Sequence, residues 1–277
     1  MKKFLCIFPI LIISGLACTR PDDEPMRSLV IEAWIDSDDF PVAILTEAFN
    51  PETSSNVSDL MVRWGRVVIS DGEDSVVLTG SVSKEFFPPF RYFNYRMEGK
   101  PGRTYTVTAD YQGMHLEATS TMLRPTPIDS VIIKPIEGED SIRNATLYFT
   151  APSDCPAYYY LKVKRNIDHV VTQPGLGMFS TTEVLEPGKK VSIPVFNPKN
   201  SVDSIVYISN LIVGENIEVS LCRVEKDVYE FWRDYDNYTM FGVSQFVSGQ
   251  GSVKGNVSGG FGIFSVQAVS RVNIDVE

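Results

Sequence analysis

Residues whose type and spacing are suited to catalysis are sparse in this chain. Its 277 residues include only two histidines, His115 and His169, which lie far apart in the sequence. The sequence has no Gly-x-Ser-x-Gly nucleophile motif, no His-Glu-x-x-His metal motif and no phosphate loop ending in Gly-Lys-Ser or Gly-Lys-Thr. We therefore expect a protein that is not an enzyme, with no catalytic residues, no metal site and no cofactor.

Carboxylates are abundant, and their number leaves a hydrolase open as a weaker alternative. The chain has 35 Asp and Glu residues, so it could contain an acid and base pair for cleaving a glycan or peptide, but the sequence cannot locate one. The acidic stretches 71–74 and 137–140 lack the ligand spacing of a calcium loop. We interpret both stretches as turns.

The first 18 residues resemble the signal of a bacterial lipoprotein. After two lysines, residues 4–13 form an apolar run too short to span a membrane as a mature helix. Residues 14–18, with the sequence SGLAC, resemble a lipobox, although Leu16 lies one position closer to the cysteine than the usual leucine. This resemblance implies that residues 1–17 are removed and that Cys18 is acylated, which would anchor the chain to a membrane. An ordinary signal peptide with a chance cysteine is the alternative.

An acidic tether is expected at residues 18–26. Its Asp22-Asp23-Glu24 run resembles the surface-export signal of Bacteroidota lipoproteins, and a plain flexible spacer is the alternative. We therefore predict a lipid-anchored protein at the outer membrane that faces the cell exterior. The formal net charge is −10, and loss of Lys2 and Lys3 with the signal makes it −12. This charge excludes nucleic acid as a partner, because phosphate binding needs a basic face.

Two cysteines remain besides Cys6, which leaves with the signal, and Cys18. Cys155 and Cys222 would lie in an oxidising compartment, where disulfides form. Their sequence spacing does not fix their distance in space, so a bond between them stays open. Neither cysteine has the spacing of a metal ligand.

Serines in a recurring Asp-Ser-aliphatic pattern are candidate modification sites. The pattern resembles the O-glycosylation sites of exported Bacteroidota proteins, and it occurs at Ser75, Ser130, Ser141 and Ser204. The alternative is that Asp-Ser ends a turn and a β-branched residue begins a strand.

Strand periodicity predicts a first β-rich region at residues 27–124. Apolar and other residues alternate over 29–35, as in a strand with two different faces. Hairpins are predicted at the turns 71–74 and 112–113. The Gly-x-x-Tyr pattern at 102–105 resembles the late strands of fibronectin type III and immunoglobulin-like domains. We therefore expect a mainly β fold whose N-terminal domain is an immunoglobulin- or fibronectin-like β-sandwich.

An aromatic-rich segment in this region is the candidate ligand-binding site. Around a diproline it contains Phe86, Phe87, Phe90, Tyr92 and Phe93. Large flat rings bind sugars or peptides when they lie on a surface, which makes these five residues the candidates. Alternatively, the rings fill a core or the interface to the next region.

A second β-rich region is expected at residues 128–277, after the paired prolines that follow Arg124. Strands at 262–269 and 272–276 are predicted to close its sheet. One helix is predicted at 227–238, and a lone helix among strands usually covers a sheet edge or the end of a sandwich. Its apolar face, spaced at i, i+3, i+4 and i+7, consists of Val228, Phe231, Trp232 and Tyr235.

Several motifs together resemble the Bacteroidota lipoprotein family with domain of unknown function 4249. Besides the signal, these motifs are residues 102–105, 158–160, 217–221, Tyr229 and the closing stretch 255–264. The likeness covers essentially the whole mature chain and is sharpest at the closing Asn-x-x-Gly-Gly-x-Gly-x-Phe. Genes of this family lie near those of TonB-dependent outer-membrane transporters, so the resemblance implies such a transporter as a partner. It assigns no catalytic residues.

The closing glycines have two interpretations. Gly259, Gly260 and Gly262 permit positive φ and close backbone approach, which suits either a ligand-facing loop or, as we favour, a tight turn. For the whole chain, we predict a surface-exposed lipoprotein that acts as a non-enzymatic binding or accessory subunit for a ligand not yet identified. A structural role in assembling a surface complex is the main alternative.

Overall fold

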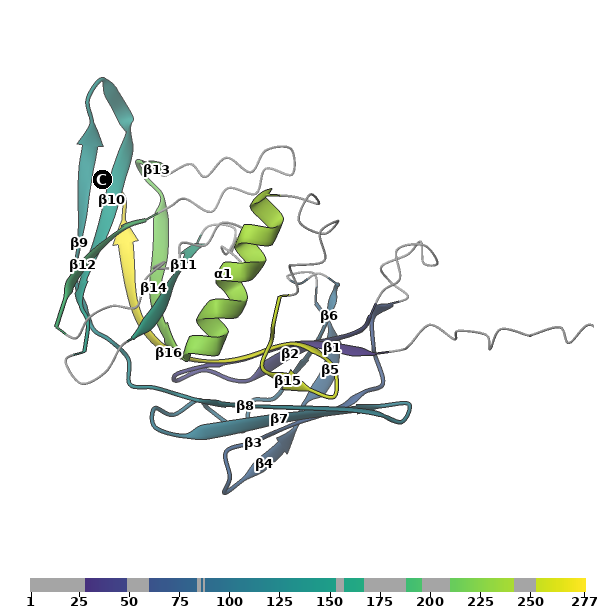
Figure 1. The fold of residues 1–277 in the computed structure, drawn as a ribbon. Helices are drawn as coiled ribbons and strands as arrows, with labels where there is room; N and C mark the ends of the chain where they lie inside the picture. The colour runs from purple at the N-terminus through teal and green to yellow at the C-terminus, as the bar shows by residue number, and fades with distance from the viewer. Residues whose placement is uncertain are drawn as a thin grey trace, which may run out of the picture.

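Strand β1 (Leu29–Asp36) lies in the middle of the largest sheet of the computed structural model (Figure 1). The structure describes residues 28–48, 60–83, 86, 88–152, 157–166, 188–195, 210–241 and 253–277. Within these ranges strands predominate, and α1 (Lys226–Phe241) is the one α-helix. The predicted mainly β fold with a helix near 227–238 is therefore confirmed.

The strands of the described part form three sheets. The seven-stranded sheet has the order β11-β14-β16-β1-β2-β6-β5, and the five-stranded sheet has the order β15-β8-β7-β3-β4. In the four-stranded sheet, β10 pairs with β9, β12 and β13.

The other strands of the seven-stranded sheet are β2 (Val42–Glu47), β5 (Thr79–Val82), β6 (Phe90–Phe93), β11 (Tyr158–Arg165), β14 (Asn216–Val224) and β16 (Phe261–Asp275). The five-stranded sheet contains β3 (Arg66–Ser70), β4 (Ser75–Val77), β7 (Thr104–Tyr111), β8 (Met114–Thr121) and β15 (Val257–Ser258). The four-stranded sheet contains β9 (Ile128–Ile136), β10 (Glu139–Thr150), β12 (Lys190–Val195) and β13 (Asn210–Ile212). Both predicted hairpins are confirmed, as β3–β4 and β7–β8.

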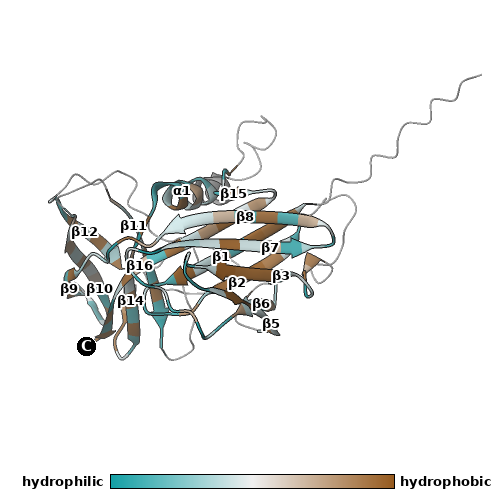
Figure 2. Cartoon of the chain, turned by 90° about the horizontal axis from the view of Figure 1, so that it is seen from below, coloured by the Kyte–Doolittle hydropathy of each residue, from teal (hydrophilic) through white to brown (hydrophobic). Residues whose placement is uncertain are grey.

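The first core lies between the seven-stranded and five-stranded sheets. Every second residue of β1, from Leu29 to Ile35, is fully buried, because successive side chains of a strand point to opposite faces. These side chains meet Tyr105 and Leu116 from the facing sheet. Figure 2 shows hydrophobic residues on β1, β2 and β3. The finer immunoglobulin- or fibronectin-like assignment stays a prediction.

Strand β16 contributes to two cores. Its first part pairs in parallel with β1, and its second part pairs antiparallel with β14. Phe264 and Val266 lie in the first core, whereas Ile274 lies in a second core, between the four-stranded sheet and strands β11 and β14. The strands predicted at 262–269 and 272–276 therefore form one continuous strand, which extends the N-terminal sheet as well. The division into two domains stays a prediction.

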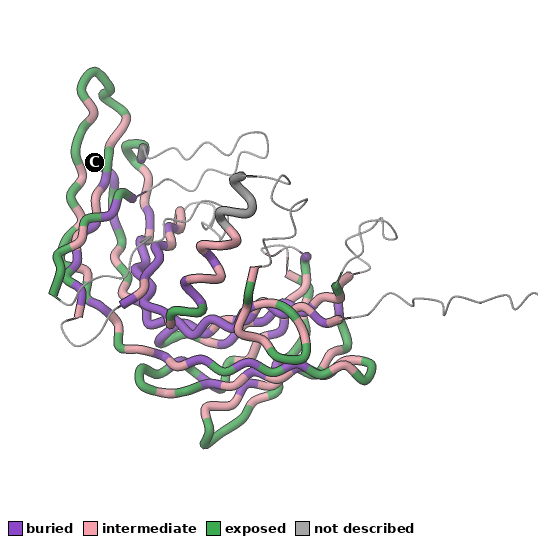
Figure 3. The backbone as a smooth tube through the Cα atoms, in the orientation of Figure 1, coloured by how far each residue is buried: buried purple, intermediate pink, exposed green. Residues whose placement is uncertain are grey.

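Helix α1 covers the face of the large sheet opposite the first core (Figure 3). Val228 and Trp232 are buried against Ile263 and Val269, which alternate along β16 with the residues of the first core. The helix thus packs on a sheet face, and not on an edge or end as we expected. Just before it, Glu225 Oε2 accepts hydrogen bonds from Ser120 Oγ and Thr121 N, both at 2.7 Å.

The closing motif carries the chain from one sheet to the other. Strand β15 pairs with β8, and β16 then pairs with β1. Asn256 fixes this crossing, because its side chain donates to the Phe264 carbonyl oxygen and accepts from the Phe264 N–H, both at 2.9 Å. Gly262 has a φ of 119°, and a Cβ there would overlap the Ile31 carbonyl oxygen. These contacts support the tight-turn interpretation of the glycines.

Candidate ligand-binding site

The predicted aromatic segment divides between core and surface. Tyr92 is 2% exposed, and its hydroxyl donates to the Val62 carbonyl oxygen at 2.7 Å and accepts from the Gly65 N–H at 3.0 Å. Phe90 packs edge-on against Tyr92, with ring centroids 5.5 Å apart, and borders the first core. Tyr92 is therefore a core residue, which corrects its place in the predicted ligand-binding set, whereas Phe90 is only partly buried and its place in that set stays a prediction. Phe87 lies outside the described residues.

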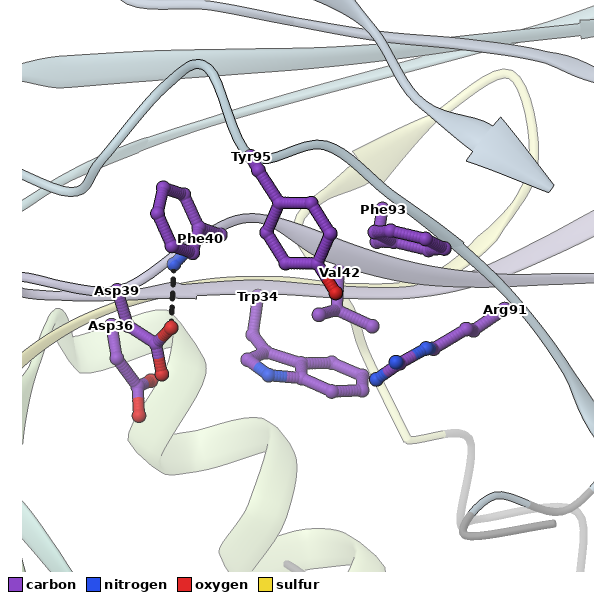
Figure 4. A pocket seen from close by; sticks show the side chains of 8 residues that line it. All are labelled: Trp34, Asp36, Asp39, Phe40, Val42, Arg91, Phe93 and Tyr95. Carbon is purple, nitrogen blue, oxygen red and sulfur yellow. Dashed lines mark hydrogen bonds between the residues drawn. The ribbon is translucent and has the colours of Figure 1, made fainter. Parts of the chain in front are cut away.

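Phe93 instead lines a pocket on the outward face of the seven-stranded sheet (Figure 4). Trp34 of β1 lies opposite Val42 of β2, and Val42 lies opposite Phe93 of β6, so three neighbouring strands place these side chains in a row on one face. The pocket has a volume of about 150 Å³ and is lined by Trp34, Asp36, Asp39, Phe40, Val42, Arg91, Phe93 and Tyr95.

Four of the eight residues that line the pocket are aromatic. The Tyr95 ring contacts Phe40 and Phe93, with centroids 5.2 and 5.0 Å apart, and Tyr95 is 65% exposed. Phe86 lies next to the pocket, with its ring centroid 5.7 Å from that of Trp34. Such rings offer flat apolar surfaces that bind the faces of sugar rings or of other side chains.

Arg91 brings a positive charge to this aromatic wall. Its guanidinium carbon lies 5.3 Å from the centroid of the Phe86 ring and 5.0 Å from that of Phe93, so cation–π contacts orient the group. In Figure 4 the guanidinium lies at one side of the Trp34 ring, and the Asp36 and Asp39 carboxylates lie at the other. The pocket therefore places opposite charges on two sides of an apolar floor.

Asp36 connects the pocket to a buried ion cluster. Its Oδ2 lies 2.7 Å from Lys162 Nζ and 3.3 Å from Arg271 Nη2. Burial is the largest single effect and lowers the pKa of Lys162, but the charge and hydrogen bond of Asp36, together with Cys222, outweigh it, so the resulting pKa is raised. Lys162 is therefore cationic at neutral pH, and the two cations offset the negative charge of Asp36.

Glu32 lies two residues before Trp34 on the same face of β1. Its register neighbours are Ile44 and Ile263, both buried. Burial raises the pKa of Glu32 to about 7, because it removes water that would solvate the charged carboxylate. A fraction of Glu32 is therefore protonated at neutral pH.

The remaining predicted positions are dispersed. Cys18, Cys155 and Ser204 lie outside the described residues. Cys222 has a free, buried thiol beneath α1, and burial raises its pKa to about 12, so it is not a reactive thiol. The other three serines, at positions 75, 130 and 141, are exposed on β4, β9 and β10, and their glycosylation stays a prediction.

In the described ranges, the structure does not gather the histidines or the acidic residues into a catalytic or metal-binding group. His169 lies outside them, and His115 forms a 2.7 Å contact with Asp110 at the surface. Among the described residues no group of three or more His, Cys, Asp or Glu side chains is placed to hold a metal ion. The described part also has no helix long and apolar enough to cross a membrane.

Sequence reasoning missed Trp34, Phe40 and Tyr95 as pocket residues. The sequence could have indicated Trp34. The alternation of β1 places it on the face opposite the core residues, where a large ring needs another partner. The contribution of Phe40 and Tyr95 depends on how two turns fold over that face, which local sequence does not specify.

The fold and the pocket define a β-rich protein with an aromatic-lined pocket on the outer face of the largest sheet that the structure describes. The chain belongs to the family described as Domain of unknown function (DUF4249), whose model matches residues 19–272. This match confirms the domain of unknown function that the motifs indicated, whereas the assignment to Bacteroidota lipoproteins stays a prediction. A comparison with curated proteins finds no match to the chain.

Proposed function

We propose that this chain is a lipid-anchored, non-enzymatic recognition protein of the outer membrane, facing the cell exterior. The pocket around Trp34 supports this proposal, because its wall combines four aromatic rings with one arginine and two aspartates. Aromatic faces with a few convergent polar groups are typical of binding sites. The acidic tether and the lipobox-like sequence at Cys18 support the location.

The size of the pocket limits what it binds. A volume of about 150 Å³ holds one ring or one side chain, and not a whole drug-sized molecule, whose pockets start at about 300 Å³. The bound group is therefore one unit of a larger ligand, such as a sugar ring of a glycan or a side chain of a peptide. The open, 65% exposed Tyr95 leaves room for the rest of that ligand outside the pocket.

Binding of glycan and peptide panels tests the proposed site. Trp34→Ala is expected to weaken binding at least about tenfold, since it removes the floor of the pocket. Tyr95→Ala should also weaken binding and, because Tyr95 is exposed, should leave the fold intact. Ile132→Ala, at an exposed residue of β9, is the matched control. Equal affinity of all four proteins for every ligand found would contradict the site.

Anchoring and partnership have their own tests. Labelled palmitate should enter the protein in cells and should not enter the Cys18→Ala variant. External protease should remove the protein from intact cells if it faces outward. A TonB-dependent transporter is the proposed partner and should co-purify from detergent-solubilised membranes. If purification recovers assembly components and no transporter, the structural role is favoured instead.

An immunoglobulin-like class is our proposal for the two packed sheets. It is supported by the two sheets packed around one core and by β1, which pairs antiparallel with β2 and in parallel with the C-terminal strand β16. An experimental structure whose strand connections differ from those of immunoglobulin-like sandwiches would reject this class.

A further inference from the structure

Two of the most exposed large apolar side chains lie at one end of the packed sheets. Trp64 is 87% exposed and Phe261 is 62% exposed. Exposed apolar side chains that gather on one part of a surface mark sites of interaction with a protein or a membrane. The place of Trp64 and Phe261 in the fold indicates what kind of surface contacts them.

The strand register places both residues at the same end. Phe261 lies opposite Val30, Val30 lies opposite Thr46, and Thr46 forms a bridge with Met61. These residues form a row across neighbouring strands, each step being about 4.8 Å. Trp64 follows Met61 by three residues and precedes β3, whose first residue is Arg66.

The same end holds the start of the described chain. Ser28 accepts a hydrogen bond from the Ala48 N–H at 2.7 Å, and Leu29 begins β1 next to the row. We name this end, with Ser28, Trp64 and Phe261, the tether end.

Covalent geometry keeps the tether end near the bilayer if Cys18 is acylated, as the proposed function states. Nine residues, 19–27, separate Cys18 from Ser28. Ten extended residue steps span at most about 35 Å, and any less extended path brings the end closer. Exposed aromatic residues on this end therefore lie within reach of the lipid headgroups.

The chemistry of the tether end suits a lipid surface. Tryptophan and phenylalanine are favoured at the membrane interface, where an apolar body meets polar headgroups. The exposed Arg63 lies next to Trp64, and Asp110 is paired with Arg66 at 3.8 Å and with His115 at 2.7 Å. The Arg66 guanidinium offsets the Asp110 charge, although the chain as a whole is acidic.

We propose that the tether end is a membrane-docking surface, with Trp64 and Phe261 inserted among the lipid headgroups. The inference rests on the proposed lipid anchor and adds an orientation to it. Strand β1 then runs away from the bilayer, and Trp34 lies four residues, or about 13 Å, farther along it than Val30. Docking therefore holds the aromatic pocket clear of the membrane and open to ligands.

Tryptophan quenching by brominated lipids tests the docking. The acylated full-length protein is reconstituted in vesicles of phosphatidylethanolamine and phosphatidylglycerol, with or without bromine on the upper acyl carbons. The chain has three tryptophans, and Trp34 and Trp232 serve as internal references because the proposal keeps both away from lipid. We expect quenching in the wild type that is largely lost in Trp64→Phe and reduced in Phe261→Ser.

The outcomes separate docking from anchoring. Vesicle flotation reports the anchor, and its failure would refute the lipid anchor of the proposed function. Flotation without quenching, or quenching that Trp64→Phe leaves unchanged, would overturn the docking surface and leave the anchor intact. If Trp64→Phe fails to fold, quenching of wild-type tryptophan fluorescence by aqueous iodide replaces that variant. Docking predicts that vesicle binding protects the tryptophan from iodide. Absence of that protection would equally overturn the docking.

Discussion

Asp36 and Lys162 are 126 positions apart in the sequence, yet Lys162 Nζ lies 2.7 Å from Asp36 Oδ2. The contact joins β1 to β11 across the two intervening strands of the seven-stranded sheet. Arg271 on β16 approaches the same oxygen at 3.3 Å. The wall of the pocket is therefore held by residues from both β-rich regions.

Asp36→Asn should destabilise the protein strongly. The change leaves the largely buried Lys162 without its counter-charge, and breaking a buried pair costs about 3–5 kcal/mol. Urea unfolding gives the free energy of unfolding. Glu230→Gln is the control, because the 3.5 Å pair between Lys226 and Glu230 on the helix surface contributes about 0.5 kcal/mol or less. Similar losses in both variants would show that the buried cluster contributes little.

Gly262→Ala should destabilise the protein more than Gly113→Ala. Both glycines have positive φ, at 119° and 82°, so both variants bear backbone strain of about 1–2 kcal/mol. Only at Gly262 would the new methyl group overlap a backbone atom, the Ile31 carbonyl oxygen, whereas Gly113 has open space. We expect an additional loss of about 1–3 kcal/mol, measured by thermal unfolding. Equal losses would mean that the β1–β16 contact is not tight.

Glu32→Gln should stabilise the protein at high pH and not at low pH. The folded-state pKa of Glu32 is raised from 4.5 to about 7, so its contribution is fully favourable below pH 4.5 and is lost as the pH rises through 7. A neutral glutamine avoids the cost of the buried charge, which is up to about 3 kcal/mol above pH 8.

Thermal unfolding at pH 5 and pH 8 measures this effect. The midpoint of Glu32→Gln is expected to exceed that of the wild type at pH 8 and to approach it at pH 5. Glu117→Gln, at an exposed residue of β8, provides the comparison, because it removes the same charge from an exposed position. A Glu32→Gln difference that is the same at both pH values would refute the buried charge.

Tyr92→Phe should cost stability although it keeps the ring. The Tyr92 hydroxyl serves both the Val62 carbonyl oxygen and the Gly65 N–H, and its loss leaves them without this partner at a cost of about 2 kcal/mol. Tyr95→Phe, at an exposed ring, should change the free energy of unfolding by less than about 0.5 kcal/mol. Chemical denaturation measures both, and an unaffected Tyr92→Phe would mean that another group replaces the hydroxyl.

The sequence by itself determined the local elements. The alternation over 29–35 predicted β1, the acidic turn 71–74 predicted the β3–β4 hairpin, and the apolar spacing after Asp227 predicted α1. Each of these depends on side-chain periodicity or on turn chemistry within about ten residues, which the chain encodes directly. The motifs together, sharpest at the closing stretch, also indicated the domain of unknown function that the match over residues 19–272 confirms.

Only the tertiary structure decided how those elements meet. Alternation indicates which residues of β16 share a face. It does not indicate that the first part of β16 pairs with β1 and the second part with β14. The pocket could not be predicted for the same reason, because the pairing of three strands brings Trp34 and Phe93 together. Strand partners are chosen by register and burial between distant segments, and no local pattern carries that information.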